Sequence, residues 1–231
     1  MISNKESSIR SIKKKFEKLS NLVLVQMDLL EKVLATEFNE EIPADLLKKL
    51  VKNEKKIDTG EVALDDLIIQ TMVLHKPVAS ELRQIFAYYR MVINLERIGD
   101  LVLKASNLTV KLNNAPVMQK SKKVMQGMLS QTSEMVNKSL LSMVNQDVDL
   151  AVWTIKKDEE VDEINKSLLQ DSITKEDLLL EENTVTVLAN LRTLISSIER
   201  IGDHAAHIAE ASIYSLIGSN IKHQNINYND F

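Results

Sequence analysis

The sequence Glu-Arg-Ile-Gly-Asp occurs twice in this chain, at residues 96–100 and again at residues 199–203. A pair of acidic residues precedes each copy at nearly the same distance: Glu54 and Asp58 in the first half, Asp158 and Asp162 in the second. Two matched features in the same order indicate an internal duplication. We therefore predict that the chain contains one structural unit twice.

The composition indicates that these units are helical. There are five Gly and three Pro among 231 residues, and 4% of the residues are aromatic, whereas a sheet protein needs more turn residues and more β-branched or aromatic runs. Pro43, Pro77 and Pro116 each stand where a periodic segment begins, as expected for proline in the first turn of a helix. The predicted helices, three per half, are residues 4–38, 43–75, 77–112, 117–145, 147–170 and about 174–217.

The predicted fold is all-α, with two tandem three-helix bundles related by the internal duplication. Residues 113–116, Asn-Asn-Ala-Pro, form a turn between them, so the first repeat is residues 1–114 and the second is residues 115–231. The second repeat ends in a polar tail that has little apolar surface to bury.

Residue usage and charge argue against several kinds of protein. The absence of Cys excludes a disulfide framework, thiolate zinc sites and a Cys nucleophile, and it fits a reducing compartment. No apolar run reaches the roughly 18 residues that a membrane helix needs, so we expect a cytoplasmic protein. A net charge of -4 argues against nucleic acid as a partner.

Acidic residues interrupt the apolar stripe of the second predicted helix in each half. The residues spaced three or four apart are Leu47, Val51, Glu54, Asp58, Val62, Asp65 and Ile69 in one half and Val148, Ala151, Ile155, Asp158, Asp162, Asn165 and Leu169 in the other. Ionised carboxylates on an inward-facing stripe have a large desolvation cost unless they are paired or bind a cation. Two explanations remain open: a salt-bridged interior that uses Arg97, Arg200, Lys55 or Lys104, and a metal site.

The third predicted helix of each half adds two more carboxylates. Glu199 and Asp203 fall at the edge of the apolar arc, and Gly202 beside them would let a neighbouring helix approach closely. If the second and third helices pack antiparallel, four carboxylates converge, as in carboxylate metal sites of helical bundles. Hard oxygen ligands suit Mg, Ca, Mn or Fe(III). We expect the second site to bind metal more tightly, because His207 follows Asp203 by one helical turn whereas Lys104 follows Asp100.

Three segments carry a resemblance to a known family. Leu-Glu-Arg-Ile-Gly-Asp at 95–100, Lys-Pro-Val-Ala-Ser-Glu-Leu-Arg at 76–83 and Glu-Arg-Ile-Gly-Asp-His-Ala-Ala-His-Ile-Ala-Glu at 199–210 closely resemble the PhoU family of phosphate-transport regulators. The resemblance covers both halves. It implies two three-helix bundles that bind iron or zinc clusters in some members, with Mn or Mg as further possibilities. It also implies repression of the phosphate-starvation response through contacts with a phosphate ABC transporter and a sensor histidine kinase.

The resemblance also assigns site residues. It implies a first metal site of Glu54, Asp58, Glu96 and Asp100 and a second of Asp158, Asp162, Glu199 and Asp203, with His207 as an additional candidate ligand. It implies a protein that is peripheral to membrane partners, and a homodimer is possible. The chain departs from the family pattern after the first pentapeptide, where residues 101–107 replace the usual His-Ala-x-Asn-Ile-Ala-Glu.

Three functional classes follow. A regulator that acts by contact is favoured, because no catalytic base or nucleophile is evident. A di-metal oxidase or phosphohydrolase is the enzyme alternative, but the chain lacks Glu-x-x-His pairs and a Gly-rich phosphate loop. The third class is a helical scaffold with structural internal acids. Lys13, Lys14 and Lys15 form a solvated face of the first helix that could meet an acidic partner.

Overall fold

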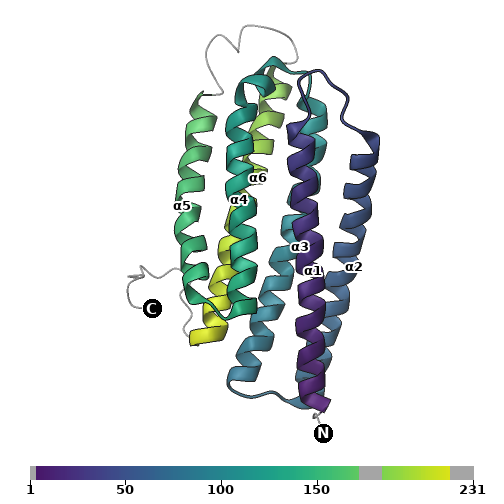
Figure 1. Cartoon of the computed structure of the whole chain (residues 1–231), viewed down its shortest axis with the longest axis vertical. Coiled ribbons are helices and arrows are strands. Elements are labelled where there is room, and N and C mark those ends of the chain that lie inside the picture. Colours follow the sequence, from purple (N-terminus) through teal and green to yellow (C-terminus); the bar gives the residue numbers. More distant parts are fainter. Residues whose placement is uncertain (1–3, 172–183, 219–231) are drawn as a thin grey trace.

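The computed structural model describes residues 4–171 and 184–218, and in these ranges it contains six α-helices and no strand (Figure 1). The all-α prediction is therefore confirmed. The helices are α1 Asn4–Ala35, α2 Ala44–His75, α3 Ser80–Leu112, α4 Pro116–Asn145, α5 Val148–Asp171 and α6 Thr184–Ile217. None of the described helices is long and apolar enough to cross a membrane.

The prolines mark helix starts with one exception. Pro43 is the N-cap residue of α2, and Pro116 is the first residue of α4. Pro77 instead lies in the connection between α2 and α3, because Lys76 ends α2 in a left-handed conformation with φ 44° and Ala79 has φ 49°. The prediction that a helix opens at Pro77 is thus wrong by three residues. The predicted helix segment 174–183 and the polar tail lie outside the described residues.

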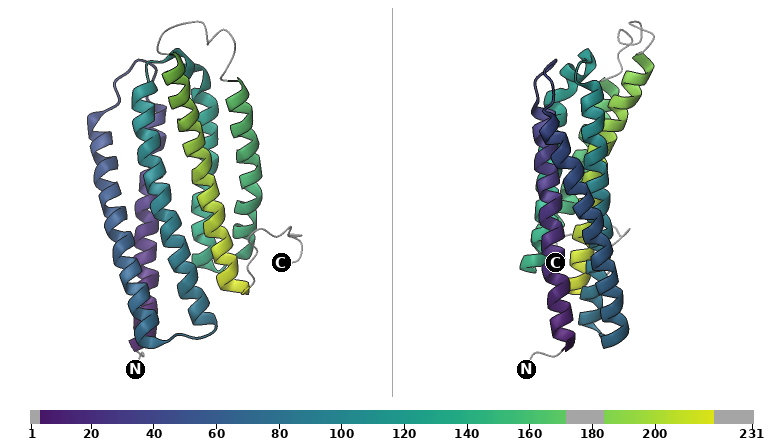
Figure 2. Two further views of the ribbon diagram at one scale, coloured as in Figure 1. Left: turned by 180° about the vertical axis from the view of Figure 1, so that it is seen from behind. Right: turned by 90° about the vertical axis from the view of Figure 1, so that its right-hand side faces the viewer.

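Each half forms a three-helix bundle, and the two bundles lie side by side. α1 and α4 face the viewer in Figure 1, α3 and α6 lie behind them, and α2 and α5 form the two edges (Figures 1 and 2). Among the described helices, α3 and α6 make the most extensive contact, while α2 packs on α1 and α3, and α5 packs on α4 and α6. The two helices that carry the repeated pentapeptide therefore form the central pair.

One large hydrophobic core runs through both bundles, and a smaller apolar cluster between α5 and α6 contains Ala151, Val152, Ala209 and Ile213. Leucine, isoleucine and methionine side chains from both halves belong to it, including the fully buried Leu95 of α3, Met128 of α4 and Ile198 of α6. Because this core is shared, burial of apolar surface stabilises the contact between the bundles as well as each bundle. The boundary at residues 114 and 115 stays a prediction.

The buried face of α2 differs from the predicted one. Leu50, Ile57, Leu64 and Ile68 are buried, whereas Val51, Val62 and Ile69 of the predicted stripe are 46%, 59% and 55% exposed. The stripe is turned by about one residue, or about 100° on the helical wheel. The reason is that α2 is an edge helix in contact with only α1 and α3 to any extent, so its buried face is narrow and most of the predicted stripe lies on its margin.

Candidate metal centre

The first carboxylate site lies between α2 and α3. Glu54 of α2 is only 5% exposed, and its Oε1 is buried without a hydrogen-bond partner among the described residues. Both of its carboxylate oxygens lie 3.1 Å from the position that a Cβ on Gly99 would take. Gly99 of the first pentapeptide therefore leaves room for a carboxylate against α3.

The Gln26 amide holds Glu54 and is itself held by Asn53, and neither residue was predicted from the sequence. Gln26 Nε2 donates to Glu54 Oε2 at 2.9 Å, and Asn53 Nδ2 donates to Gln26 Oε1 at 2.8 Å. Gln26 is 0% exposed, so its amide group depends on these hydrogen bonds. The available signal was an amide side chain among the apolar residues of the first helix.

The other first-site acids are more open to solvent. Asp58 and Asp100 are exposed, and Glu96 is half-buried. Arg97 lies 3.5 Å from Glu96 and 3.8 Å from Asp100, measured between side-chain nitrogen and carboxylate oxygen. The cation beside Asp100 is thus Arg97, and no salt bridge joins Lys104 to Asp100 in the described chain. The salt-bridge explanation of the acidic stripe therefore applies here in part, since Arg97 neutralises some of the charge, and metal binding at this site stays a prediction.

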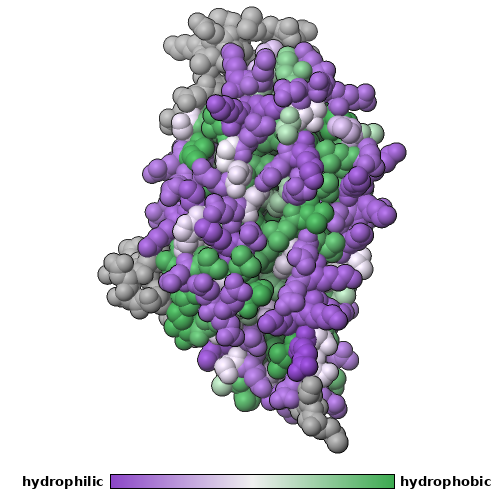
Figure 3. Space-filling view, viewed as in Figure 1, coloured by the Kyte–Doolittle hydropathy of each residue, from purple (hydrophilic) through white to green (hydrophobic). Residues whose placement is uncertain are grey.

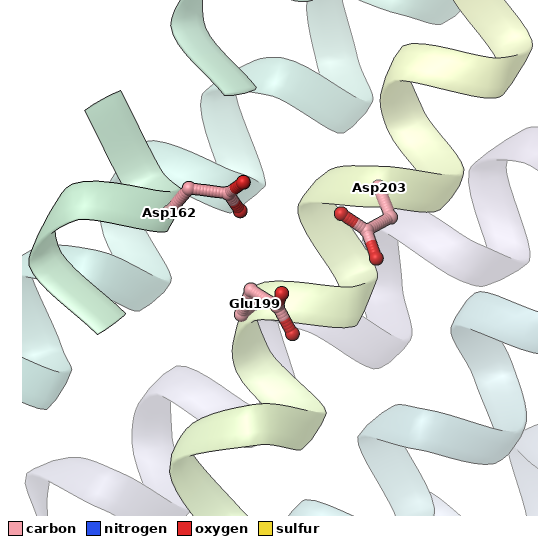
Figure 4. Close-up of side chains that lie close together, drawn as sticks. All are labelled: Asp162, Glu199 and Asp203. Atoms are coloured by element: carbon pink, nitrogen blue, oxygen red, sulfur yellow. The ribbon is translucent and has the colours of Figure 1, made fainter. Parts of the chain in front are cut away.

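The second site is more compact. Asp162 of α5 and Glu199 and Asp203 of α6 point toward one another (Figure 4), and each can offer one carboxylate oxygen such that the three atoms lie within 4.8 Å of one another. Asp158, the fourth predicted ligand, lies one turn away with Oδ1 3.3 Å from the Cβ position of Gly202. Gly202 thus makes room for a carboxylate, as Gly99 does in the first half.

Burial and mutual repulsion raise the pKa values of these carboxyl groups. Burial, with the neighbouring carboxylates, raises the pKa of Glu54, of Asp158 and of Glu199 to about 7 in each case. The pKa values of Asp203 and Glu96 are also raised by burial and by adjacent acids. Ionised carboxylates held this close favour either a proton or a cation.

The two histidines that follow the second pentapeptide have different surroundings. His204 Nδ1 and Asn94 Oδ1 are hydrogen-bonded at 2.8 Å, which joins α6 to α3. Burial, and the positive charge of His207, lower the pKa of His204 to about 4. The charge of His207 offsets part of the rise that burial and Asp162 cause in the pKa of Asp203, but His207 is not one of the residues that bring ligand atoms within 4.8 Å of one another.

The residues present fit a metal ion. The buried Oδ1 atoms of Asp158 and Asp162 have no hydrogen-bond partner among the described residues. Together with Glu199 and Asp203 they form an oxygen-only donor set, which suits a hard cation or iron. Asp162, Glu199 and Asp203 would hold the ion, while Asp158 would support them from the adjacent turn. In the first site Glu54 and Glu96 are not among the described residues that bring three ligand oxygens within 4.8 Å of one another, and Arg97 lies beside Glu96 as a competing cation.

Comparisons with known proteins identify the family of this chain. The sequence model of the PhoU domain matches residues 16–109 and 125–212, which is more than half of the chain. The chain belongs to the PhoU family. The matched segments contain both pentapeptides and all eight predicted carboxylate ligands, so the family resemblance drawn from those residues is confirmed.

Individual members of the PhoU family match over nearly the full length. The PhoU homolog of Pseudomonas aeruginosa, described as a phosphate-specific transport system accessory protein, is 29% identical over 95% of this chain and 93% of its own length. The homolog from Aquifex aeolicus is 31% identical over 92% of this chain and 96% of its own. The crystal structure of PhoU from Pseudomonas aeruginosa superposes with a TM-score of 0.81, covering 92% of this chain and 99% of that chain at 25% identity.

Proposed function

We propose that this chain is a metal-binding regulator of phosphate uptake that acts by protein contacts. Metal binding is supported by one observation. One carboxylate oxygen from each of Asp162, Glu199 and Asp203 lies within 4.8 Å of the other two. The phosphate part is supported by the relatives, which are named as accessory proteins of a phosphate-specific transport system. The partners would be a phosphate ABC transporter and a sensor histidine kinase, met at the cytoplasmic side of the membrane.

The proposed cofactor is iron or zinc, with Mn or Mg as further candidates. Carboxylate oxygens bind all four ions, and half-buried imidazole near Asp203 favours iron and zinc over Mg. The native metal is tested by elemental analysis of protein purified without chelator or histidine tag. We expect bound metal that falls by at least half in the variant Asp162→Asn/Asp203→Asn. The matched control is Glu159→Gln, an exposed acid of the same helix.

The regulatory role is tested in a deletion strain. Loss of the protein should derepress phosphate-uptake genes at high external phosphate, and the parent chain should restore repression. Asp162→Asn/Asp203→Asn should restore it incompletely, whereas Glu159→Gln should restore it fully. Normal repression in the deletion strain, with unchanged phosphate accumulation, would contradict the proposal.

We also propose that the chain has no hydrolytic activity, since the sequence shows no evident catalytic base or nucleophile and no Gly-rich phosphate loop. The purified, metal-loaded protein should not turn over phosphate esters or nucleotides. Turnover that is abolished by Glu199→Gln would instead support a di-metal enzyme.

A further inference from the structure

A groove lined by lysines runs between α1 and α2. The first carboxylate site lies on the other side of α2, against α3. The groove has a volume of about 550 Å³, with Lys15 and Lys18 of α1 and Lys55 and Lys56 of α2 along its rims. A shallower hollow of about 400 Å³ meets it at Lys55 and adds Lys48 and Lys52. Among the described residues no acidic side chain lines either hollow.

The floor of the groove is apolar. Leu19 and Leu22 of α1 line it together with Gly60 and Ala63 of α2. Gly60 permits this floor, because a Cβ there would lie 3.1 Å from Leu19 Cδ1. Figure 3 shows hydrophobic surface between hydrophilic side chains over α1 and α2. A ligand of this groove therefore needs an apolar face as well as negative charge.

The shape of the groove fits a helix. The groove is lined on α2 from Lys55 to Ala63, and the adjoining hollow, which α2 alone lines, continues from Lys55 to Leu47. Together they follow α2 for about 24 Å at 1.5 Å per residue. A helix of about four turns has that length and can place apolar side chains on the floor and acidic side chains against both rims. A flat membrane surface would contact the lysine rims but would not reach the floor.

We propose that this groove binds an acidic amphipathic helix of a partner protein. Charge supports this partner, because the whole chain carries a net charge of -4 and an approaching acidic segment is repelled elsewhere and attracted to the lysines. The proposal rests on the proposed function in that a regulator acting by contact needs such a surface. It does not depend on bound metal.

The test measures binding of labelled 16-residue helical peptides to the full chain by fluorescence anisotropy. The probe has glutamates on two sides of a leucine stripe. Its controls are a peptide of the same composition without the stripe and one with lysine in place of glutamate. We expect binding of the probe alone, with affinity that falls as salt rises. Lys18→Glu/Lys55→Glu should weaken binding at least about tenfold.

The matched control variant is Lys111→Glu/Lys123→Glu, which reverses two exposed lysines outside the groove; it should change affinity less than about twofold. Ala63→Phe, which fills the floor without changing charge, should also weaken binding, and unfolding temperatures establish that each variant is folded. Equal binding of the peptide without a stripe would overturn the proposal, as would binding only to vesicles of anionic phosphatidylglycerol. Failure of peptide binding in a chain that still represses phosphate-uptake genes would reject the groove alone and leave the proposed function standing.

Discussion

Glu54 occupies the space that a side chain on Gly99 would fill, with both carboxylate oxygens 3.1 Å from that Cβ position. At this distance a methyl group on residue 99 would displace the Glu54 carboxylate. The glycine therefore determines how closely α2 and α3 approach at the acidic site. Asp158 and Gly202 repeat the relationship with a slightly longer distance of 3.3 Å. Each pentapeptide thus supplies two carboxylates of its site, from its Glu and its Asp. Its glycine leaves the space for a third carboxylate, which comes from the neighbouring helix.

Gly99→Ala should weaken metal binding at the first site, because the new methyl group displaces the Glu54 carboxylate. The measurement is metal titration in a background that carries Asp162→Asn/Asp203→Asn, so that only the first site reports. Gly127→Ala is the matched control, since nothing lies within 4 Å of its Cβ position. It should leave metal affinity unchanged and raise the free energy of unfolding by about 0.5–1 kcal/mol. Unaltered first-site affinity in Gly99→Ala would contradict this account.

Gln26→Leu should destabilise the fold and disturb only the first site. The change removes the hydrogen bond to Glu54 and leaves Asn53 Nδ2 with only the Leu22 carbonyl. Loss of buried hydrogen-bond partners costs about 1–3 kcal/mol, which denaturant unfolding can measure. Second-site metal affinity serves as the internal control and should not change. An equal loss at both sites would indicate a global effect rather than a local one.

Metal-free protein should become less stable as pH rises from 6.5 to 8. Glu54, Asp158 and Glu199 have folded-state pKa values of about 7, above their ordinary values of 4.5, 3.8 and 4.5. The folded state therefore holds protons that the unfolded state has already lost, and the stability that they confer disappears as pH rises through 7. His204 acts in the opposite sense, because its folded-state pKa of about 4 lies below 6.5 and stability is lost as pH falls through that range.

Thermal unfolding of chelator-treated protein measures this pH dependence. Asp158→Asn should reduce the slope between pH 6.5 and 8, while Asp66→Asn, an exposed acid of α2, should leave it unchanged. Added metal should restore stability most at pH 8, where no proton competes for the carboxylates. If the stability of metal-free protein rises with pH across this interval, the pKa values of these acids are not raised in the folded state.

Arg97→Gln should strengthen first-site metal binding, because Arg97 neutralises Glu96 and Asp100 in the absence of metal. Arg97 is 58% exposed, and exposed ion pairs contribute about 0.2–1 kcal/mol, so the gain is at most about fivefold in affinity. Lys104→Asn is the matched control on the same helix and should have less effect. The second site should remain the tighter one in the unmodified chain. A larger gain in first-site metal affinity from Lys104→Asn than from Arg97→Gln would show that Lys104, as expected from the sequence, is the cation that competes with metal.

Helical spacing predicted which acidic residues lie near one another better than it predicted their surroundings. Spacing of three and four along a helix places Asp162 near Asp158 and Asp203 near Glu199 whatever the rest of the fold does. Two of the three prolines, Pro43 and Pro116, marked where helices begin. The exposure of Asp58 and Asp100 was not predictable in the same way, because it depends on which neighbours each helix has. Spacing alone left the stripe of α2 wrong by about one residue, since the narrow contact face of an edge helix is a tertiary property.

The hydrogen bond of Glu54 to Gln26, and that of Gln26 to Asn53, were also beyond prediction from spacing. Gln26 lies on a different helix, and Asn53 faces it only after α1 and α2 have packed. The spacing of apolar residues along a helix shows which face is buried, but it does not show which other helix packs on that face. The pairing of α3 with α6 belongs to the same class, since it joins residues about 100 positions apart, such as Asn94 and His204.

The placement of α2 and α5 at the edges has a consequence for local opening. Each carboxylate site joins an edge helix to a central one, so charge repulsion in the metal-free protein acts on the helices with the fewest neighbours. Backbone amides of α2 and α5 should exchange with solvent deuterium sooner than those of α3 and α6, which are covered from both sides. A cation at either site would slow that exchange by closing the edge helix onto the central pair.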